Sequence, residues 1–395
     1  MTDVEVTPGS QAALRRANQQ RVVDALRSGG TLTQAELARY TGLSPASVSN
    51  IVRNLRAAGT VSVRETSSNG RRARAVTLIR PPGAVVALDF ALDRLTAALG
   101  DSEGAVLARE SIAYDVAAEP DRAVRRAVWL VETLLTRLRV DHATIAAVTA
   151  SVPGPVDLRT GEIGAITCMP RWAGYRPAEA LSARLRVPVQ AENDANLCAL
   201  AEMRDGVAAE RRHVIYVRVK EGVGAGIVVG GRLFRGAGGT AGEIGHIGLD
   251  ERGQVCRCGN RGCLETVLGA PYLLGMVPQQ GHRTPESVAE LVRAAEEGDP
   301  GSRRVVAEAG AALGRGLGVL ANTFNPELVV LGGELVEAGE ALLEPVRRTL
   351  ELGTLGSALA QMGIVRGSLG DDAALRGALV LAAAEAAEAA VEAEA

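Results

Sequence analysis

Three of the chain's five cysteines and one of its four histidines lie close together between residues 242 and 265. This segment reads GEIGHIGLDERGQVCRCGNRGCLE and contains His246, Cys256, Cys258 and Cys263. Three thiolates and one imidazole suit a tetrahedral zinc ion, and four protein ligands leave no position for a reacting water. The spacing therefore predicts a structural zinc site. The alternative, free thiols beside a core histidine, fits poorly with a loop that contains Gly259 and Gly262. Cys168 and Cys198 lie far from this loop and are predicted to be core residues.

The composition is that of a globular chain with an uneven charge distribution. Its 395 residues are 47% apolar, enough for two or three domains. Without a signal pattern or a spanning apolar run, the sequence predicts a cytoplasmic protein with no membrane segment. Residues 1–80 carry 12 Arg against 5 acidic residues, a balance of +7, whereas the remainder balances at −10 to give −3 overall. The N-terminal part is therefore expected to bind a polyanion.

Helix signals recur at short intervals in residues 18–59. Apolar residues have helical spacing in residues 18–27, and Thr33-Gln-Ala-Glu36 is a capping box that begins a second helix. Ser44 and Pro45 begin a third helix, whose apolar stripe is Val48, Ile51, Val52 and Leu55. Three short helices with a glycine-containing turn between the last two predict a helix-turn-helix.

The polar face of the third helix carries the residue types that contact bases and phosphates. These are Ser47, Asn50 and Arg53. Strands at residues 61–64 and 75–79 are predicted to form a wing, whose loop carries Arg71, Arg72 and Arg74 for phosphate or minor-groove contacts. We predict a winged helix-turn-helix that binds double-stranded DNA. The alternative is a protein-binding helical module with a solvated basic hairpin.

The strong strand and helix breaker Arg80-Pro-Pro-Gly83 suggests a domain boundary. We predict a DNA-binding domain at 1–80, a linker at 81–84, a first lobe at 85–194 and a second lobe at 195–395. Strands are expected at 85–90, 95–99, 105–112, 146–152, 214–219, 226–229 and 328–331, and helices at 120–139, 285–297 and 303–322. Glycine-rich turns at 222–226 and 332–333 are weak candidates for phosphate or sugar contacts, and residues 192–196 could be an ordinary turn and helix cap. The Ala/Glu-rich tail at 382–395 is predicted to be a helix or a frayed end.

Taken in order, these motifs resemble the ROK family of sugar kinases and transcriptional repressors. The resemblance rests on G-E-x-G-H followed by C-x-C-G-x-x-G-C-x-E and extends from about residue 82 to residue 377. The winged head resembles the repressor branch, which includes regulators of xylose, glucose and N-acetylglucosamine use. The resemblance implies an α/β, two-lobed actin/hexokinase-like (ribonuclease H-like) body, with a C-terminal helix that packs back on the first lobe.

The resemblance also implies the site residues. A sugar pocket between the lobes would be lined by Asn193, Asp194, Glu243, His246 and Glu265, and zinc would be held by His246, Cys256, Cys258 and Cys263. His246 would then serve twice, with one ring nitrogen on zinc and the other N–H directed at a sugar hydroxyl.

The chain departs from the family's kinases where those enzymes bind ATP phosphates. Their D-x-G-x-T turn corresponds here to residues 89–93, where Ala91 adds a methyl group and Asp93 a negative charge. Lys220-Glu221-Gly222 similarly replaces a G-T-G turn. We therefore predict poor ATP binding and no catalytic residue, although Asp194 matches the position of the kinase base.

These observations predict a sugar-responsive transcriptional regulator that represses carbohydrate-utilisation genes and leaves its operator when a sugar binds. A homodimer or homotetramer is expected. One alternative is an ATP-dependent hexose or amino-sugar kinase with a DNA-binding head. The other is a metal sensor, which would need an exchangeable zinc ion. The sequence leaves open which sugar is bound and whether the protein represses or activates.

Overall fold

The chain folds into two compact units, a head and a body. The computed structural model describes residues 11–57, 61–68, 71–78, 83–165, 167–277 and 284–393. The head comprises residues 1–82 with 385–395, and the body comprises residues 83–384. Across the described ranges, no helix is long and apolar enough to cross a membrane.

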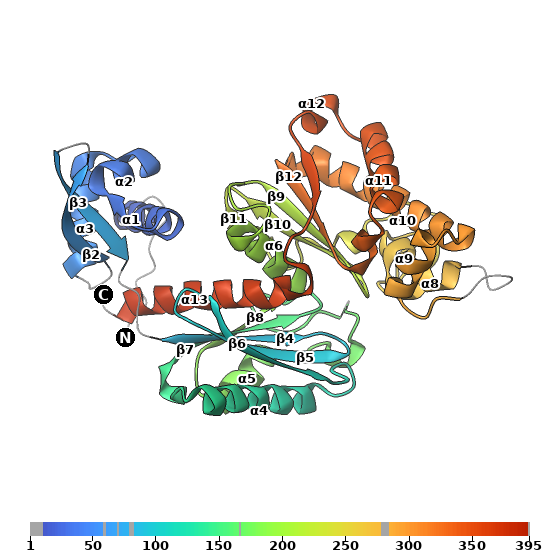
Figure 1. Ribbon diagram of the computed structural model, residues 1–395, viewed down its shortest axis with the longest axis horizontal. Coiled ribbons are helices and arrows are strands. Elements are labelled where there is room, and N and C mark those ends of the chain that lie inside the picture. Colours follow the sequence, from blue (N-terminus) through green and yellow to red (C-terminus); the bar gives the residue numbers. More distant parts are fainter. Residues whose placement is uncertain are drawn as a thin grey trace. The chain divides into compact units, whose positions relative to one another are not determined.

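Three helices and a small sheet form the head (Figure 1). The helices are α1 (Gln11–Gly29), α2 (Gln34–Thr41) and α3 (Pro45–Ala57). They enclose a core that includes Val22, Leu26, Leu37, Val48, Val52 and Leu55. The predicted capping box is confirmed, since the Glu36 backbone N–H donates to Thr33 Oγ1 and the Thr33 N–H donates to the Glu36 carboxylate. Ser44 likewise caps α3, accepting from the Ser47 N–H at 3.1 Å.

The strands of the wing are longer than predicted. Strands β2 (Val61–Ser68) and β3 (Arg71–Leu78) pair antiparallel, and β1 (Leu32–Thr33) adds to the other edge of β3. Ser67 pairs with Arg72 and Ser68 with Arg71, so these residues belong to the strands and not to the predicted loop. Only Asn69 and Gly70, which lie outside the described residues, separate the two strands. An Asn-Gly dipeptide favours such a two-residue connection, and this signal was missed.

The first lobe of the body is built on a five-stranded sheet in the order β6-β5-β4-β7-β8. Its strands are β4 (Ala84–Phe90), β5 (Arg94–Gly100), β6 (Val106–Ala113), β7 (Ile145–Val152) and β8 (Val189–Asn193). The first three form the predicted antiparallel meander, and β7 and β8 continue the sheet parallel to β4. Figure 1 shows α4 (Pro120–Leu138) and α5 (Pro177–Leu185) on one face of this sheet. Their apolar residues pack with those of the strands in one core.

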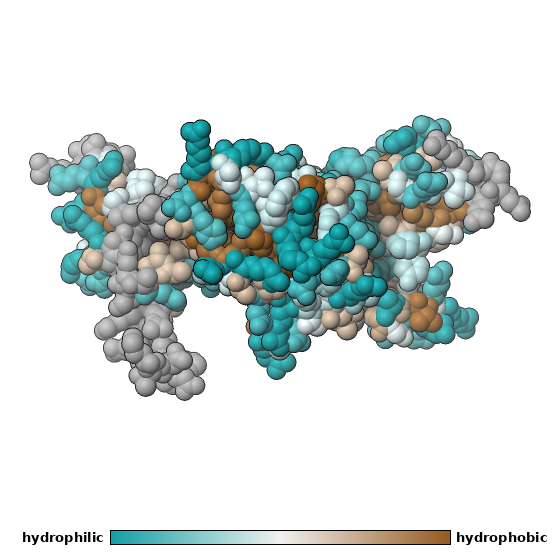
Figure 2. All heavy atoms as spheres, turned by 90° about the horizontal axis from the view of Figure 1, so that it is seen from below, coloured by the Kyte–Doolittle hydropathy of each residue, from teal (hydrophilic) through white to brown (hydrophobic). Residues whose placement is uncertain are grey.

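The surface on the side of α4 is mixed in character. Hydrophilic side chains surround separate apolar patches in Figure 2. Trp129, on the exposed side of α4, carries the Arg126 guanidinium 3.9 Å from its ring centroid. A cation above an aromatic face partly shields this apolar side chain from water.

The second lobe repeats the topology of the first. Its sheet has the order β11-β10-β9-β12-β13, with an antiparallel meander followed by two parallel strands. The strands are β9 (Val214–Val219), β10 (Val223–Val229), β11 (Arg232–Leu233), β12 (Leu328–Gly332) and β13 (Gly363–Arg366). One face packs against α6 (Asp194–Asp205). The other packs against a helical layer that includes α9 (Val288–Glu296), α10 (Pro300–Phe324) and α11 (Glu340–Gly353).

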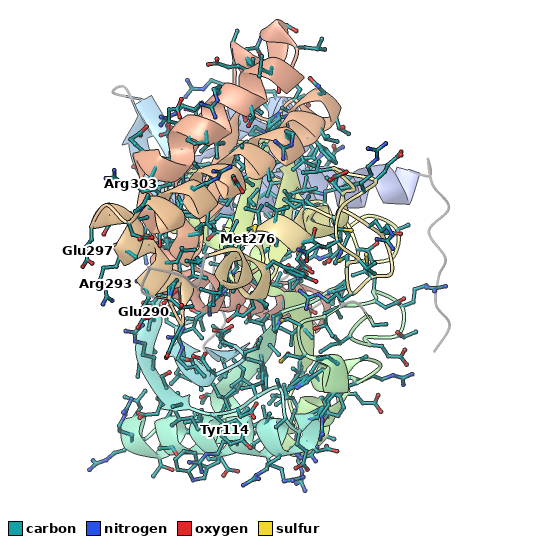
Figure 3. The ribbon with its side chains drawn as sticks, turned by 90° about the vertical axis from the view of Figure 1, so that its right-hand side faces the viewer. Tyr114, Met276, Glu290, Arg293, Glu297 and Arg303 are labelled. Atoms are coloured by element: carbon teal, nitrogen blue, oxygen red, sulfur yellow. The ribbon has the colours of Figure 1, made fainter. Side chains whose placement is uncertain are left out.

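Helix α9 illustrates why these helices form. Its buried residues, Val288, Leu291, Val292 and Ala295, recur at helical spacing, and Ser287 caps its first turn. Figure 3 shows Glu290 and Arg293 on the outer side of this helix, with Glu297 just past its end and Arg303 of α10 close by. The helix therefore has an apolar inner face and a charged outer face.

The C-terminal helix α13 (Ala373–Ala393) begins nine residues before the predicted tail. In the body it lies against elements of both lobes. A Cβ atom at Gly104 would lie 2.7 Å from the Leu379 carbonyl oxygen, and one at Gly377 would collide with the Leu197 backbone of α6. Close approach of the helix to the first lobe and to α6 therefore depends on glycine at these two positions.

Candidate functional site

A pocket in the body gathers residues that are distant in the sequence. It is lined by Pro153, Gly154, Thr167, Cys168, Asn193, Asp194, Arg218, Lys220, Glu221, Gly222, Val223, Gly224, Glu243, His246, Arg257 and Glu265. All five residues expected to contact a sugar are among them. Cys198 is buried in the core as predicted, and Cys168 packs against the first-lobe core while also lining the pocket. Burial raises the pKa of the Cys168 thiol to about 12.

Asn193 and Asp194 reach the pocket at the junction between β8 and α6. Asn193 is the N-cap of α6, and its Oδ1 accepts hydrogen bonds from the backbone N–H groups of Ala195 and Asn196 at 2.9 and 3.2 Å. Its Nδ2 donates to the Gly154 carbonyl at 3.1 Å. The cap interpretation of this segment is therefore confirmed, and Asn193 fixes Asp194 as the first residue of the helix.

Asp194 is held by a cation that was not predicted. Arg218 Nη1 lies 2.8 Å from Asp194 Oδ2, and the two side chains are only 13% and 19% exposed. Burial raises the pKa of the Asp194 carboxyl, while Arg218 opposes that shift. Burial lowers the pKa of Arg218, but Asp194 and Asp89 outweigh it and hold that pKa well above its usual range. Asp194, which was expected to match the position of the kinase base, is thus part of a buried ion pair.

Two glycines flank Arg218 in the middle of the second-lobe sheet. Arg218 lies on β9, and its cross-strand neighbours are Gly224 on β10 and Gly332 on β12. Residues paired across strands share a face, so neither neighbour carries a side chain beside the arginine. On the same face, a Cβ atom at Gly332 would collide with the Tyr216 hydroxyl.

Glu243 and His246 lie on one side of a short 3₁₀ turn. The turn covers Ile244–His246 with Glu243 as its N-cap, and positions three residues apart eclipse in such a turn. Glu243 Oε2 lies 3.9 Å from His246 Nε2. Burial raises the pKa of Glu243 to about 7, and the nearby carboxylates of Asp194 and Glu265 add to this shift.

Glu265 is connected to the cysteine loop through Arg257, which stands between two of the cysteines. Arg257 Nε donates to Glu265 Oε1 at 2.7 Å, and Glu265 Oε2 accepts from the Val223 N–H at 3.4 Å. The Glu265 side chain is almost fully buried. One of its oxygens is therefore engaged by the cysteine loop, while the residue still lines the pocket.

The four predicted metal ligands converge. The ligand atoms of His246, Cys256, Cys258 and Cys263 all lie within 4.8 Å of one another. Cys256 Sγ is 3.5 Å from His246 Nδ1, and Cys258 Sγ is 3.6 Å from Cys263 Sγ. Zinc–sulfur bonds of about 2.3 Å and zinc–nitrogen bonds of about 2.0–2.1 Å place tetrahedral ligands roughly 3.5–3.8 Å apart. The donor set therefore fits a zinc ion, with Nδ1 facing the thiols and Nε2 facing Glu243.

The loop reaches this geometry through glycine, as predicted. Gly259 and Gly262 have φ values of +90° and +58°. A Cβ atom at Gly262 would collide with the Asp250 carbonyl oxygen. Bridges between Gly248 and Cys263, and between Val255 and Arg261, then hold the loop folded back on itself.

The predicted DNA-contacting residues lie in the head. Asn50 and Arg53 are exposed on α3, and Ser47 is half-buried with its Oγ 2.9 Å from that of Ser44. Arg74 is exposed on β3. Arg71 and Arg72 also lie in β3, but their side chains are outside the described residues.

Three basic residues of the pocket were missed by sequence reasoning: Arg218, Lys220 and Arg257. Lys220 is the only lysine of the chain, and Arg257 separates two predicted metal ligands. Either feature could have marked the residue as a candidate for the pocket. Arg218 stands in an ordinary strand pattern, and nothing local marks its function.

Comparisons with known proteins agree with this architecture. Residues 85–385 match the model of the ROK family, and residues 16–73 match that of the MarR family. The chain is 30% identical over 386 residues to the N-acetylglucosamine repressor of Escherichia coli O157:H7, covering 92% of this chain and 93% of the relative. It is 26% identical over 387 residues to the xylose repressor of Caldicellulosiruptor bescii, covering 94% and 97%.

Two solved structures define the fold further. A ROK family transcriptional regulator, a homologue of the E. coli MLC protein, superposes with a TM-score of 0.79 at 25% identity, covering 96% of this chain and 98% of the other. The ROK hexokinase from Thermus thermophilus has a TM-score of 0.64 at 32% identity, covering 76% and 98%. The head is thus a winged helix-turn-helix and the body an actin-like fold, and the chain belongs to the ROK family.

Proposed function

We propose that this protein is a transcriptional repressor whose head binds operator DNA and whose body releases the head from DNA when a sugar enters the pocket. The observation that carries the proposal is one chain that joins a winged helix-turn-helix to a pocket lined by Asn193, Asp194, Glu243, His246 and Glu265. The likeness to an N-acetylglucosamine repressor over 92% of the chain supports the same reading.

The pocket suits a polyhydroxyl ligand. Carboxylate oxygens of Asp194 and Glu243 accept hydrogen bonds from hydroxyl groups, and the Asn193 amide sits beside them. Several acceptors at fixed positions select a ring of hydroxyl groups by their spacing. The ion pair with Arg218 holds the Asp194 carboxylate in one orientation.

His246, Cys256, Cys258 and Cys263 would hold a zinc ion with a structural role. When bound, zinc fixes the fold of the cysteine loop and supplies no reaction of its own. His246 Nδ1 faces the thiols, so its Nε2–H is the group left to donate toward Glu243 or a sugar hydroxyl.

We propose that the protein has no sugar kinase activity. A kinase base must be free to take a proton from the sugar hydroxyl, whereas Asp194 is paired with a buried guanidinium at 2.8 Å. The β4–β5 turn carries Ala91 and Asp93 in place of the residues that admit nucleotide phosphates in family kinases. The rival function, a sugar kinase with a DNA-binding head, is supported by the likeness to the Thermus thermophilus hexokinase.

The protein is proposed to act in the cytoplasm as a homodimer or homotetramer, with one head per half-site of a pseudo-palindromic operator. The sugar shifts this equilibrium only by binding the DNA-free conformation more tightly than the DNA-bound one. A gel-shift assay on the DNA upstream of its own coding region, with and without D-xylose, D-glucose and N-acetyl-D-glucosamine, tests the proposal. Weaker DNA binding with one sugar is expected, and no effect of any sugar contradicts it. An ADP-release assay with the same sugars and Mg-ATP tests for kinase activity, and turnover would support the rival function.

A further inference from the structure

Helix α6 carries a buried carboxylate that contacts the connection between β13 and α13. This carboxylate is Glu202, whose side chain is fully buried. Its Oε1 accepts hydrogen bonds from the backbone N–H groups of Ser368 and Leu369 at 2.7 and 3.0 Å. Its Oε2 accepts from the Ser368 hydroxyl at 3.1 Å and from the Val207 N–H at 3.0 Å. Hydrogen bonds to a charged acceptor are stronger than those to a neutral one, so Glu202 holds the β13–α13 connection against α6.

The other end of α6 lines the pocket. Asp194 is the first residue of this helix and Asn193 is its N-cap, and both are lining residues. Glu202 follows Asp194 by eight residues in the sequence, which places it about 12 Å farther along the helix axis. Packed helices shift as rigid elements when a domain closes around a ligand. A displacement of Asp194 is therefore expected to reach Glu202.

Helix α13 lies against both lobes, so its attachment decides which lobe it follows. A Cβ atom at Gly377 would collide with the backbone of Leu197 in α6, and the β5–β6 turn approaches α13 equally closely at Gly104. The first lobe also contacts the start of α13 through Arg109 of β6, whose Nη1 lies 2.5 Å from Asp372 Oδ1. These two side chains are 56% and 42% exposed, and ion pairs in water stabilise little. Because Glu202 is buried and this pair is not, the start of α13 should follow α6 when the lobes move apart.

Resting on the proposed function, we propose that Glu202 is the positioning residue that passes the occupancy of the pocket to α13. A ligand that shifts Asp194 moves α6, and α6 moves the start of α13 through the β13–α13 connection. Helix α13 is continuous from Ala373 to Ala393, and its residues from Glu385 onward belong to the head. The movement is thereby passed to the unit that binds DNA. Without the Glu202 carboxylate, the sugar still binds but the operator affinity responds little.

Two affinities measured on the full chain test this inference. Isothermal titration gives the affinity for D-glucose, N-acetyl-D-glucosamine and D-xylose. Fluorescence anisotropy gives the affinity for the DNA upstream of its own coding region, with and without the sugar that binds. We expect this sugar to weaken operator binding at least about fivefold in the wild-type protein and less than about twofold in Glu202→Gln. The dissociation constant for the sugar should stay within about threefold of the wild-type value, because Glu202 lies outside the pocket lining.

Two variants at the same connection support the test. Ser368→Ala removes one hydroxyl and keeps the backbone hydrogen bonds to Glu202, so the sugar effect on operator binding should fall about twofold. This milder change decides the matter if Glu202→Gln does not fold. Asp372→Asn breaks the exposed pair with Arg109 and is the matched control, which should leave the sugar effect unchanged.

Amide hydrogen exchange with and without the sugar locates the response. The sugar should change exchange in α6 and in residues 373–384 of the wild-type protein, but only in α6 of Glu202→Gln. The inference is overturned, and a sugar-responsive repressor remains, if Glu202→Gln keeps the wild-type sugar effect or if Asp372→Asn removes it. Loss of sugar affinity together with the sugar effect also overturns it, since Glu202 would then only stabilise the fold. If no sugar changes operator binding by the wild-type protein, the proposed function fails and the inference fails with it.

Discussion

The buried ion pair between Arg218 and Asp194 leads to the most demanding prediction. Replacing Arg218 with Met keeps a long side chain but leaves the Asp194 carboxylate without its counter-ion. Two unit charges 2.8 Å apart interact by roughly 6 kcal/mol at an effective dielectric constant of about 20. Part of this energy offsets the cost of removing both groups from water, and breaking one partner of a buried pair destabilises proteins by about 3–5 kcal/mol. Because both side chains are less than one-fifth exposed, solvent screens the pair little.

We therefore expect Arg218→Met to lower the free energy of unfolding of the body by about 3–5 kcal/mol. Asp194→Asn should also be costly, because it removes the carboxylate that contacts the buried guanidinium directly. The double variant Arg218→Met/Asp194→Asn removes both charges, so we expect it to be more stable than either single variant. A coupling energy of at least about 2 kcal/mol should follow from this cycle.

Urea unfolding followed by tryptophan fluorescence measures these differences. The chain has two tryptophans, Trp129 and Trp172, and both lie in the body, so the signal reports the unfolding of that unit. Arg315→Met, on the exposed side of α10, is the matched control and should change stability by less than about 0.5 kcal/mol. The reasoning is refuted if the free energy of unfolding of Arg218→Met lies within about 1 kcal/mol of the wild-type value. It is also refuted if the loss of stability in the double variant equals the sum of the losses in the two single variants.

Three further predictions follow from the site and the head. Cys258→Ala should remove zinc and abolish sugar binding together, because the cysteine loop positions Arg257 against Glu265. Metal analysis and calorimetry measure the two losses, and a metal-free variant that keeps its sugar affinity contradicts the prediction. Arg53→Ala should weaken operator binding about tenfold without changing sugar affinity, since Arg53 is exposed on α3 in the head, and fluorescence anisotropy with operator DNA measures the loss. Leu55→Ala should destabilise the head by about 2–5 kcal/mol, because Leu55 is fully buried in its core, and an unchanged melting transition of the head would count against that core assignment.

Several elements were predictable because their signals are local. The capping box at Thr33 and the Ser44-Pro45 start of α3 are read from four residues or fewer, and both helices begin where those signals place them. The convergence of His246, Cys256, Cys258 and Cys263 was predictable for the same reason. All four residues lie in one short loop, so their spacing limits how far apart they can be.

Some glycines were misinterpreted because their role depends on a contact with a residue far away in the sequence. Gly224 was assigned to a turn, and Gly226 to the end of that turn and the start of a strand, yet both lie within β10. A Cβ atom at Gly226 would lie 2.6 Å from the Ala199 Cβ atom, so glycine is needed there for α6 to approach the strand. From the sequence alone, a glycine that allows a neighbouring helix to approach cannot be distinguished from a glycine that bends the chain.

The sequence by itself determined the helices of the head, the clustering of one histidine and three cysteines at the cysteine loop and the polar segment at Asn193 and Asp194, since each depends on residues close together in the chain. Only the tertiary structure decided which charges meet. Arg218 reaches Asp194 across 24 positions, from a central strand to the first turn of a helix, and no periodicity encodes that pairing. The charge balance of the pocket depends on this contact, because a buried charge is strongly destabilising unless it is paired. What the pocket can bind therefore depends on which charges are paired and not only on which charges are present.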